Sequence, residues 1–496
     1  QTGEERQAVL RRFSGLHIQL RHGTLLFGEQ QKAAGRTSSM PLNDRSIIDF
    51  HTPGTAQCEM TGRWLQLGVL ALGIAGLFAV LLVLSRMPGS DSFFPWVDFF
   101  HTALVVHVDQ SVLIWFLAMA GVAWSLVIPQ SNRHIMAQRI AFALALFGTL
   151  GIALSAFVGS GTPLMNNYVP VLQRPFFFAA LGVFGLGIAV QSVLALKSTG
   201  RALLLEDQTH LPTLAAFTLA MAVIMALFAL GTAWLQLPVE VTGQGYYEYL
   251  FWGAGHTLQF AYTQLLLLAW LLLALHSGVE IPAKPRWIVW LLWLGVAPVL
   301  LVPLIYGVYA TLSIESRTAF TQLMQYGGGI AVIPIGILVV LGLSRADKAD
   351  AAGRPLRRAL WMSLLLFFAG GLIGMLISEV NTVIPAHYHG SIVGVTLALM
   401  GLAYLLLPRL GYAPVRGRLA NLQPWVYGSG QLLHIIGLAV SGAMGIQRKT
   451  AGAAQGLDSL SVKLAMGVMG LGGLLAVIGG ILFVWIMLRA FWRRAE

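Results

Sequence analysis

The chain has 496 residues, of which 57% are hydrophobic and only 10% are charged. A soluble domain carries about 25% charged residues, so this composition excludes a water-soluble globular protein and predicts a chain whose solvent is lipid. The net charge of +11 does not indicate nucleic-acid binding, because the basic residues lie in short connections between apolar segments, where they set membrane orientation.

The apolar segments are about 20 residues long or longer, which is the length of a membrane-spanning helix rather than of a barrel strand. Only helices and closed barrels satisfy the backbone in lipid, so the predicted fold is all-α, an integral membrane protein of about twelve transmembrane helices. The spans are expected at 62–86, 101–128, 138–160, 172–196, 211–236, 249–276, 287–312, 321–344, 358–380, 383–408, 425–446 and 461–490.

A polar segment precedes the first expected span. Residues 1–61 are predicted to be a cytoplasmic extension, and residues 62–496 to be the twelve-helix membrane domain. Residues 1–39 either belong to that extension or precede a translation start at Met40, and the sequence does not decide between the two.

Basic residues are distributed unequally between the two sides of the expected spans. Of the 31 Lys and Arg residues, 25 fall in the N-terminal segment, the loops after the even spans and the C-terminus. Because cations accumulate on the cytoplasmic side of membrane proteins, both termini are predicted to be cytoplasmic.

Four of the histidines inside the expected spans lie at a common depth. His107 lies in the second span, His256 in the sixth, and His387 and His389 in the tenth. All three spans run from outside to inside, and each histidine follows the start of its span by a few residues, so all four are expected within about 10 Å of the outer boundary. Ionisable side chains in membranes are costly and mark functional sites, although buried histidines bonded to the backbone are the alternative.

The spacing of His387 and His389 indicates two separate ligand positions. Residues two apart on a helix point about 200° apart, so these imidazoles can each ligate a different haem. A haem held by two histidines carries electrons, whereas one held by a single histidine keeps an open face for a gas. In the eleventh span, His434 is predicted to contact a haem edge or propionate, and Asp109 is expected to be a buried acid that orients a histidine.

The segment Ala386–His387–Tyr388–His389–Gly390 resembles the haem-ligand motif in the catalytic subunit of haem–copper oxidases, the family of cytochrome c oxidases and nitric oxide reductases. The resemblance covers nearly the whole chain from about residue 62 and implies a core of twelve spans with two haems. It implies that His387 ligates the high-spin haem and that His389 and His107 ligate the low-spin haem.

Two further stretches resemble this family. Phe251–Gln259 is similar to the sixth span, in which His256 would be the first ligand of a copper ion. Arg448 and Lys449 resemble the basic pair that neutralises the haem propionates.

The expected copper site departs from the family pattern. Tyr309 and Ala310 stand where the seventh span of the family has two adjacent histidines. Copper held by His256 alone would be weakly bound, and the possible substitutes for the missing ligands are Tyr306, Tyr309, Glu315 and Glu379. Of these, Tyr309 and Glu379 are predicted to complete the catalytic site with His256. A carboxylate would favour iron, which leaves copper and non-haem iron both open as the second metal.

The positions that carry protons in the family are also altered. Leu258 and Phe260 follow His256 where the family has polar side chains, and Ile335 and Ile337 do the same in the eighth span. Apolar side chains relay no protons, so proton pumping by the usual routes is not expected.

The resemblance implies an oxidoreductase of the terminal oxidase or nitric oxide reductase type in a bacterial plasma membrane. Electrons would come from a cytochrome c or from a copper- or haem-bearing donor subunit, and the substrate would be O2 or NO. A copper-free two-haem subunit for electron transfer or gas sensing is the main alternative. A twelve-span transporter is a further one, although such proteins commonly show internal repeats that we do not find here.

Overall fold

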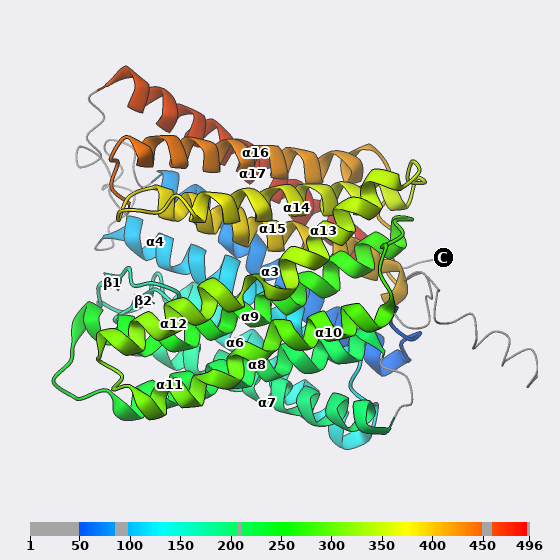
Figure 1. The fold of residues 1–496 in the computed structure, drawn as a ribbon, viewed down its shortest axis with the longest axis horizontal. Coiled ribbons are helices and arrows are strands. Elements are labelled where there is room, and N and C mark those ends of the chain that lie inside the picture. Colours follow the sequence, from blue (N-terminus) through cyan, green and yellow to red (C-terminus); the bar gives the residue numbers. More distant parts are fainter. Residues whose placement is uncertain (1–48, 85–97, 206–209, 449–458, 494–496) are drawn as a thin grey trace, which may run out of the picture.

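The computed structural model describes residues 49–84, 98–205, 210–448 and 459–493. Long helices run side by side through the whole molecule and form one bundle (Figure 1). Among the described residues, 11 helical runs are long and apolar enough to cross a membrane. A further long helix, α16 (Arg418–Ala443), lies along the same bundle, which confirms the all-α membrane fold of about twelve spans.

Eight of the eleven apolar runs are single helices. They are α3 (Thr55–Leu84), α6 (Asn132–Leu154), α7 (Pro175–Leu205), α8 (Leu211–Gln236), α9 (Gly243–His276), α14 (Gly353–Gly374), α15 (Val383–Leu406, continued by the 3-10 turn η5, Leu407–Leu410) and α17 (Leu460–Phe491). The first of them begins at Thr55, seven residues before the expected start of the first span. The C-terminal α17 packs back against α3 and so closes the bundle.

The other three runs are interrupted. The second span consists of α4 (Phe99–Val108), the π-helix η3 (Asp109–Ile114) and α5 (Trp115–Ser125). The seventh span consists of α10 (Pro285–Val296), the 3-10 helix η4 (Ala297–Leu301) and α11 (Val302–Val308). The eighth span consists of α12 (Ile314–Gly327) and α13 (Gly329–Arg345). Pro298 lies in the break of the seventh span, where its missing N–H prevents a regular α-helical bond.

Helix α16 falls short of the hydropathy of a simple span because it carries Asn421, Gln423, Gln431 and His434. One side of it packs against α14, α15 and α17, while apolar side chains such as Trp425 and Ile436 remain exposed on the other. Glycines allow this close contact: a Cβ at Gly437 would lie 2.5 Å from the backbone nitrogen of Met469. Small residues at helix contacts are the usual means of bringing membrane helices together.

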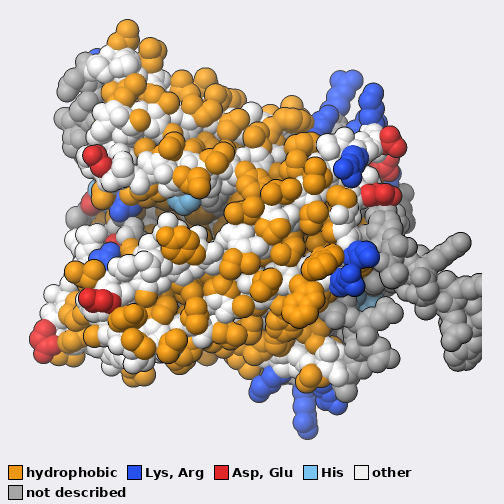
Figure 2. Space-filling model, in the orientation of Figure 1, with side chains coloured by type: hydrophobic (Ala, Val, Ile, Leu, Met, Phe, Trp, Pro, Cys, Tyr) orange, Lys and Arg blue, Asp and Glu red, His pale blue; other side chains and the backbone are white. Residues whose placement is uncertain are grey.

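The two ends of the bundle differ in charge, as the unequal distribution of Lys and Arg among the loops predicts. Figure 2 shows Lys and Arg side chains gathered at one end of the bundle, while hydrophobic side chains cover the length between the two ends. The described beginning and end of the chain both lie at the basic end (Figure 1). By the excess of cations, this is the cytoplasmic end.

A short antiparallel hairpin lies at the opposite, outer end of the bundle (Figure 1). Strands β1 (Pro163–Leu164) and β2 (Val171–Leu172) pair between α6 and α7. The residues between the strands do not remain at the surface, because Met165–Pro170 line the internal cavity described below.

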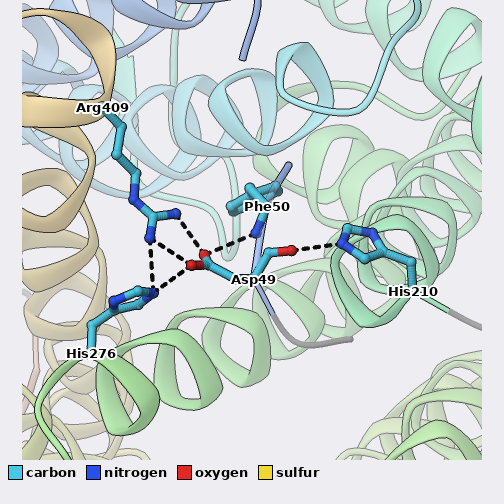
Figure 3. A network of polar contacts seen from close by, with 5 residues as sticks. All are labelled: Asp49, Phe50, His210, His276 and Arg409. Carbon is cyan, nitrogen blue, oxygen red and sulfur yellow. Dashed lines mark hydrogen bonds and ion pairs between the residues drawn. The ribbon is translucent and has the colours of Figure 1, made fainter. Parts of the chain in front are cut away.

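At the cytoplasmic end, Asp49 joins the N-terminal segment to the ends of three helical elements (Figure 3). Arg409 of η5 donates to both of its carboxylate oxygens, at 2.6 and 2.7 Å, and His276 at the end of α9 lies 3.0 Å from Oδ2. The backbone oxygen of Asp49 accepts from His210, which precedes α8, at 2.6 Å. Burial raises the pKa of Asp49, but His276 and Arg409 outweigh it and hold the pKa well below its ordinary value.

The Asp49 contacts are expected to stabilise the fold. Asp49→Asn should lower the free energy of unfolding by about 2 kcal/mol, because a charged, partly buried hydrogen-bond acceptor is lost. Since the pKa of Asp49 is depressed in the folded protein, this contribution is fully present above about pH 4 and disappears as the pH falls through the folded value. The measurement is the thermal midpoint of the purified protein in detergent at neutral and acidic pH.

The matched control is Glu59→Gln. Glu59 pairs with Arg63 at 2.6 Å, but the two side chains are 42% and 41% exposed, so this pair should contribute little. Equal midpoints for the two variants at neutral pH would contradict the stabilising role of Asp49.

Candidate functional site

A large cavity of about 3270 Å³ lies within the bundle. Ordinary small-molecule sites measure about 300–1,000 Å³, so this cavity has room for more than one large ligand. Figure 2 shows a histidine in the hollow on the visible face. Five histidines line the cavity, namely His107, His256, His387, His389 and His434.

Four of these imidazoles share one hydrogen-bonding pattern. In each, Nδ1 lies 2.8–2.9 Å from a main-chain oxygen: His107 from Ala75, His387 from Gly370, His389 from Pro385 and His434 from Met469. A carbonyl oxygen can only accept, so Nδ1 carries the proton and Nε2 keeps its lone pair. Metal-ligating histidines characteristically donate their other nitrogen in this way.

His387 and His389 contact different neighbours from the same helix. The imidazole of His387 donates to α14 through Gly370, whereas the ring of His389 lies 5.2 Å from the ring of His434 on α16. The spacing of two residues therefore places one imidazole on each side of α15.

His107 and His389 line the same cavity from different helices. His107 does so from α4. The π-helix η3 begins two residues later, at Asp109, and this local widening is a feature that the sequence did not reveal. Such π-helical turns are frequent at functional sites.

The expectation that Asp109 orients a histidine is wrong. The Nδ1 of His107 bonds to Ala75, and neither carboxylate oxygen of Asp109 has a hydrogen-bond partner among the described residues. The helix turns the acid away from the histidine because residues two apart lie on opposite faces.

His256 differs from the other four histidines because both of its nitrogens are occupied. Nδ1 lies 2.7 Å from the backbone oxygen of Trp252, and Nε2 lies 2.9 Å from the hydroxyl of Tyr168. Burial and the charge of Glu248 raise the pKa of Tyr168, against the effect of a hydrogen bond from Gln259, so its hydroxyl stays protonated. Tyr168 was not predicted, since it lies in a connection between spans and no motif marks it.

The structure does not bring Tyr309 and Glu379 to the cavity histidines. Helix α11 ends at Val308, and Tyr309 follows in an extended conformation with 39% of its surface exposed. Glu379 is exposed in the turn between α14 and α15. Neither side chain lines the cavity.

The basic pair predicted to neutralise propionates is described only in part. Arg448 lines the cavity and lies 3.4 Å from the side-chain oxygen of Asn167. Lys449 falls outside the described residues. The described arginine is therefore positioned at the cavity wall, as a partner for an acidic group inside it.

Comparisons with known proteins find similarity over most of the chain. The profile of the family described as cytochrome c and quinol oxidase polypeptide I matches residues 59–482. The chain is 32% identical to an uncharacterized protein of Rickettsia prowazekii (strain Madrid E), covering 86% of this chain and 95% of the relative. It is 29% identical to an uncharacterized protein of Aquifex aeolicus (strain VF5), covering 73% of this chain and 88% of the relative.

Proposed function

The chain belongs to the cytochrome c and quinol oxidase polypeptide I family, and on that premise we propose that it is a two-haem, electron-transferring subunit in a bacterial plasma membrane. The observation that carries this proposal is the set of cavity histidines whose Nε2 lone pairs remain available. His107 and His389 would hold a low-spin haem, and His387 a high-spin haem. A haem with one histidine ligand supplies an open coordination face at which a gas can be reduced.

O2 or NO is the proposed substrate, and the electrons come from a partner. The chain has one cysteine, Cys58, so it cannot form a dinuclear copper entry site from a cysteine pair. The donor is therefore a cytochrome c or a separate subunit that carries copper or haem. Arg448 would hold a propionate at the outer wall of the cavity through a charge-assisted hydrogen bond.

We further propose that the reaction is not coupled to proton pumping by the usual routes of the family. Phe260 and Ile335 are buried, and Leu258 lines the cavity, at positions where polar side chains would be needed. Protons for gas reduction would then have to come from the outer face.

A copper-free role in electron transfer or gas sensing is the second candidate. The occupied Nε2 of His256 favours it, since this nitrogen would otherwise be the first ligand of a second metal. Family membership leaves the transporter alternative without support.

Turnover measurements separate these candidates. The purified protein is reduced through a soluble mediator, and the consumption of NO and of O2 is followed separately. A catalytic subunit consumes one of the gases, and the His387→Ala variant does not. A sensor or electron-transfer subunit binds CO when reduced but consumes neither gas.

A glycine beside His387 gives a further prediction. A Cβ at Gly374 would lie 2.5 Å from Nδ1 of His387, so Gly374→Ala must displace the imidazole and break its bond to Gly370. Losing this support should weaken iron binding at His387 about 10- to 100-fold and lower the fraction of protein that binds CO. The measurement is the CO difference spectrum per chain.

The matched control is Gly371→Ala, which alters the same helix where a Cβ would meet nothing within 4 Å. This variant should keep the CO-binding fraction of the native protein. Equal losses in the two variants would contradict the proposed role of His387.

A further inference from the structure

We propose that Tyr168 caps the metal-binding nitrogen of His256, so that the gas cavity has a metal-free tyrosine–histidine pair where the family resemblance implies a second metal. This inference rests on the proposed function, because it assumes that the cavity holds a haem at which a gas binds. It adds Tyr168 to the site and replaces the second metal with a hydrogen-bonded pair of side chains.

The direction of the hydrogen bond follows from the partners of His256. Its Nδ1 lies 2.7 Å from the main-chain oxygen of Trp252, so Nδ1 must carry the proton and donate. In a neutral imidazole Nε2 is then an acceptor, and the Tyr168 hydroxyl, 2.9 Å away, is the donor. The lone pair that would bind a metal is therefore engaged with a hydroxyl proton.

The loop that carries Tyr168 is held in an unusual backbone conformation. Tyr168 has φ = 67°, and Val169 donates its N–H to the backbone oxygen of Asn167 across it at 2.9 Å. A γ-turn with a left-handed central residue is rare and strained for a tyrosine. Backbone strain of this kind persists only where the surroundings enforce it, and it is concentrated at functional sites.

The surroundings that enforce this conformation come from α9. Both carboxylate oxygens of Glu248 accept hydrogen bonds from Asn167, one from its backbone nitrogen and one from its amide, each at 2.9 Å. Two turns along the same helix, Gly255 admits the tyrosine ring, because a Cβ there would lie 2.1 Å from Cγ of Tyr168. The loop tip and the helix therefore fit one another with the Tyr168 ring directed at His256.

The remaining groups near His256 do not form a metal site. Among the described residues, no group of three or more His, Cys, Asp or Glu side chains could hold a metal ion. Copper sites usually need three or more nitrogen or sulfur ligands. In addition, the guanidinium of Arg317 lies 4.3 Å from the ring of Trp252, whose centroid lies 4.7 Å from that of His256, so a positive charge already lies near this site and disfavours a further cation.

The competing arrangement is a metal held by His256 and a deprotonated Tyr168 together. It is distinguished by metal content, because that metal would be present once per chain and would be lost with either ligand. The capped pair instead predicts that copper, zinc and non-haem iron stay far below one per chain, even after growth with added copper.

The test compares the native protein with Tyr168→Phe and Gly255→Ala, and uses Tyr262→Phe as the matched control. Tyr262 lines the same cavity from α9 without contacting His256. Metal content is measured in all four proteins, together with the C–O stretching frequency of the reduced, CO-bound form, which reports the polarity next to the bound gas.

The expected result is no second metal in any protein, and a shifted C–O band in Tyr168→Phe and Gly255→Ala but not in Tyr262→Phe. Gly255→Ala gives the same information if Tyr168→Phe does not accumulate. One metal per chain that disappears with Tyr168→Phe overturns the inference, and so does an unchanged C–O band in both variants. Native protein without haem would refute the proposed function, while the metal content would still test the capping separately.

Discussion

His389→Ala is expected to reduce the haem content from about two per chain to about one, with loss of the low-spin haem. The Nδ1 of His389 is fixed by Pro385, so its Nε2 is the only ring nitrogen available to an iron, and alanine offers no replacement. His387, on the other side of α15, donates to Gly370 and should keep its own haem. The reduced protein should therefore still bind CO. The measurement is haem per chain with the reduced-minus-oxidised spectrum.

The control for this variant is His434→Ala. The ring of His434 lies 5.2 Å from that of His389, so its removal makes a similar change in the same wall of the cavity. We expect this variant to retain both haems, because we propose that His434 contacts the edge of a haem rather than its iron. Loss of a haem from His434→Ala and not from His389→Ala would show that His434, and not His389, is the iron ligand.

His387→Ala is expected to produce the complementary phenotype. The low-spin spectrum should remain, while CO binding and gas consumption should fall by more than about 100-fold, because the ligand itself is lost rather than a group that supports it. The bond from Nδ1 to Gly370 shows that His387 is held independently of His389. The measurement is the CO difference spectrum and the rate of NO or O2 consumption of the same preparation.

The two variants together test whether one helix serves two haems. Adding imidazole to the buffer can restore CO binding to His387→Ala by supplying a free ligand, which would show that the cavity itself is intact. If His387→Ala and His389→Ala both lost all haem, the division of α15 into two independent ligand positions would be refuted.

Much of the fold is predictable from the sequence because lipid imposes simple requirements on it. Apolar length gives the spans, and the unequal distribution of Lys and Arg gives their orientation. Helix α16 was also predicted, although its polar side chains keep it below the hydropathy of an ordinary span. The breaks at η3 and η4 depend on local backbone adjustment and on packing, which apolar periodicity does not encode.

The candidate site was predictable where it is carried by residues that are unusual in a membrane. A histidine inside a span stands out, so His107, His256, His387 and His389 were all expected to matter, and all four line one cavity. Tyr168 does not stand out, because tyrosines are common near membrane surfaces. Its position depends on a hairpin between α6 and α7 and on the space above Gly255, which only the folded chain creates.

The same reasoning explains why Tyr309 and Glu379 are not among the residues of the cavity. Tyr309 is assigned to the seventh span by counting back from Pro334 in the eighth, and Glu379 to the outer end of the ninth expected span; both assignments assume regular helices. The seventh span contains the 3-10 segment Ala297–Leu301 and ends at Val308, so Tyr309 is carried beyond the helix. Glu379 lies in the turn after α14, which ends at Gly374.

We propose that His107, His387 and His389 together hold two haems within one cavity. Haem and metal analysis of the purified native chain, combined with the reduced-plus-CO difference spectrum, is the decisive measurement. We expect about two haems per chain, with CO bound to only one of them. A purified, folded protein that shows no haem absorption would contradict it.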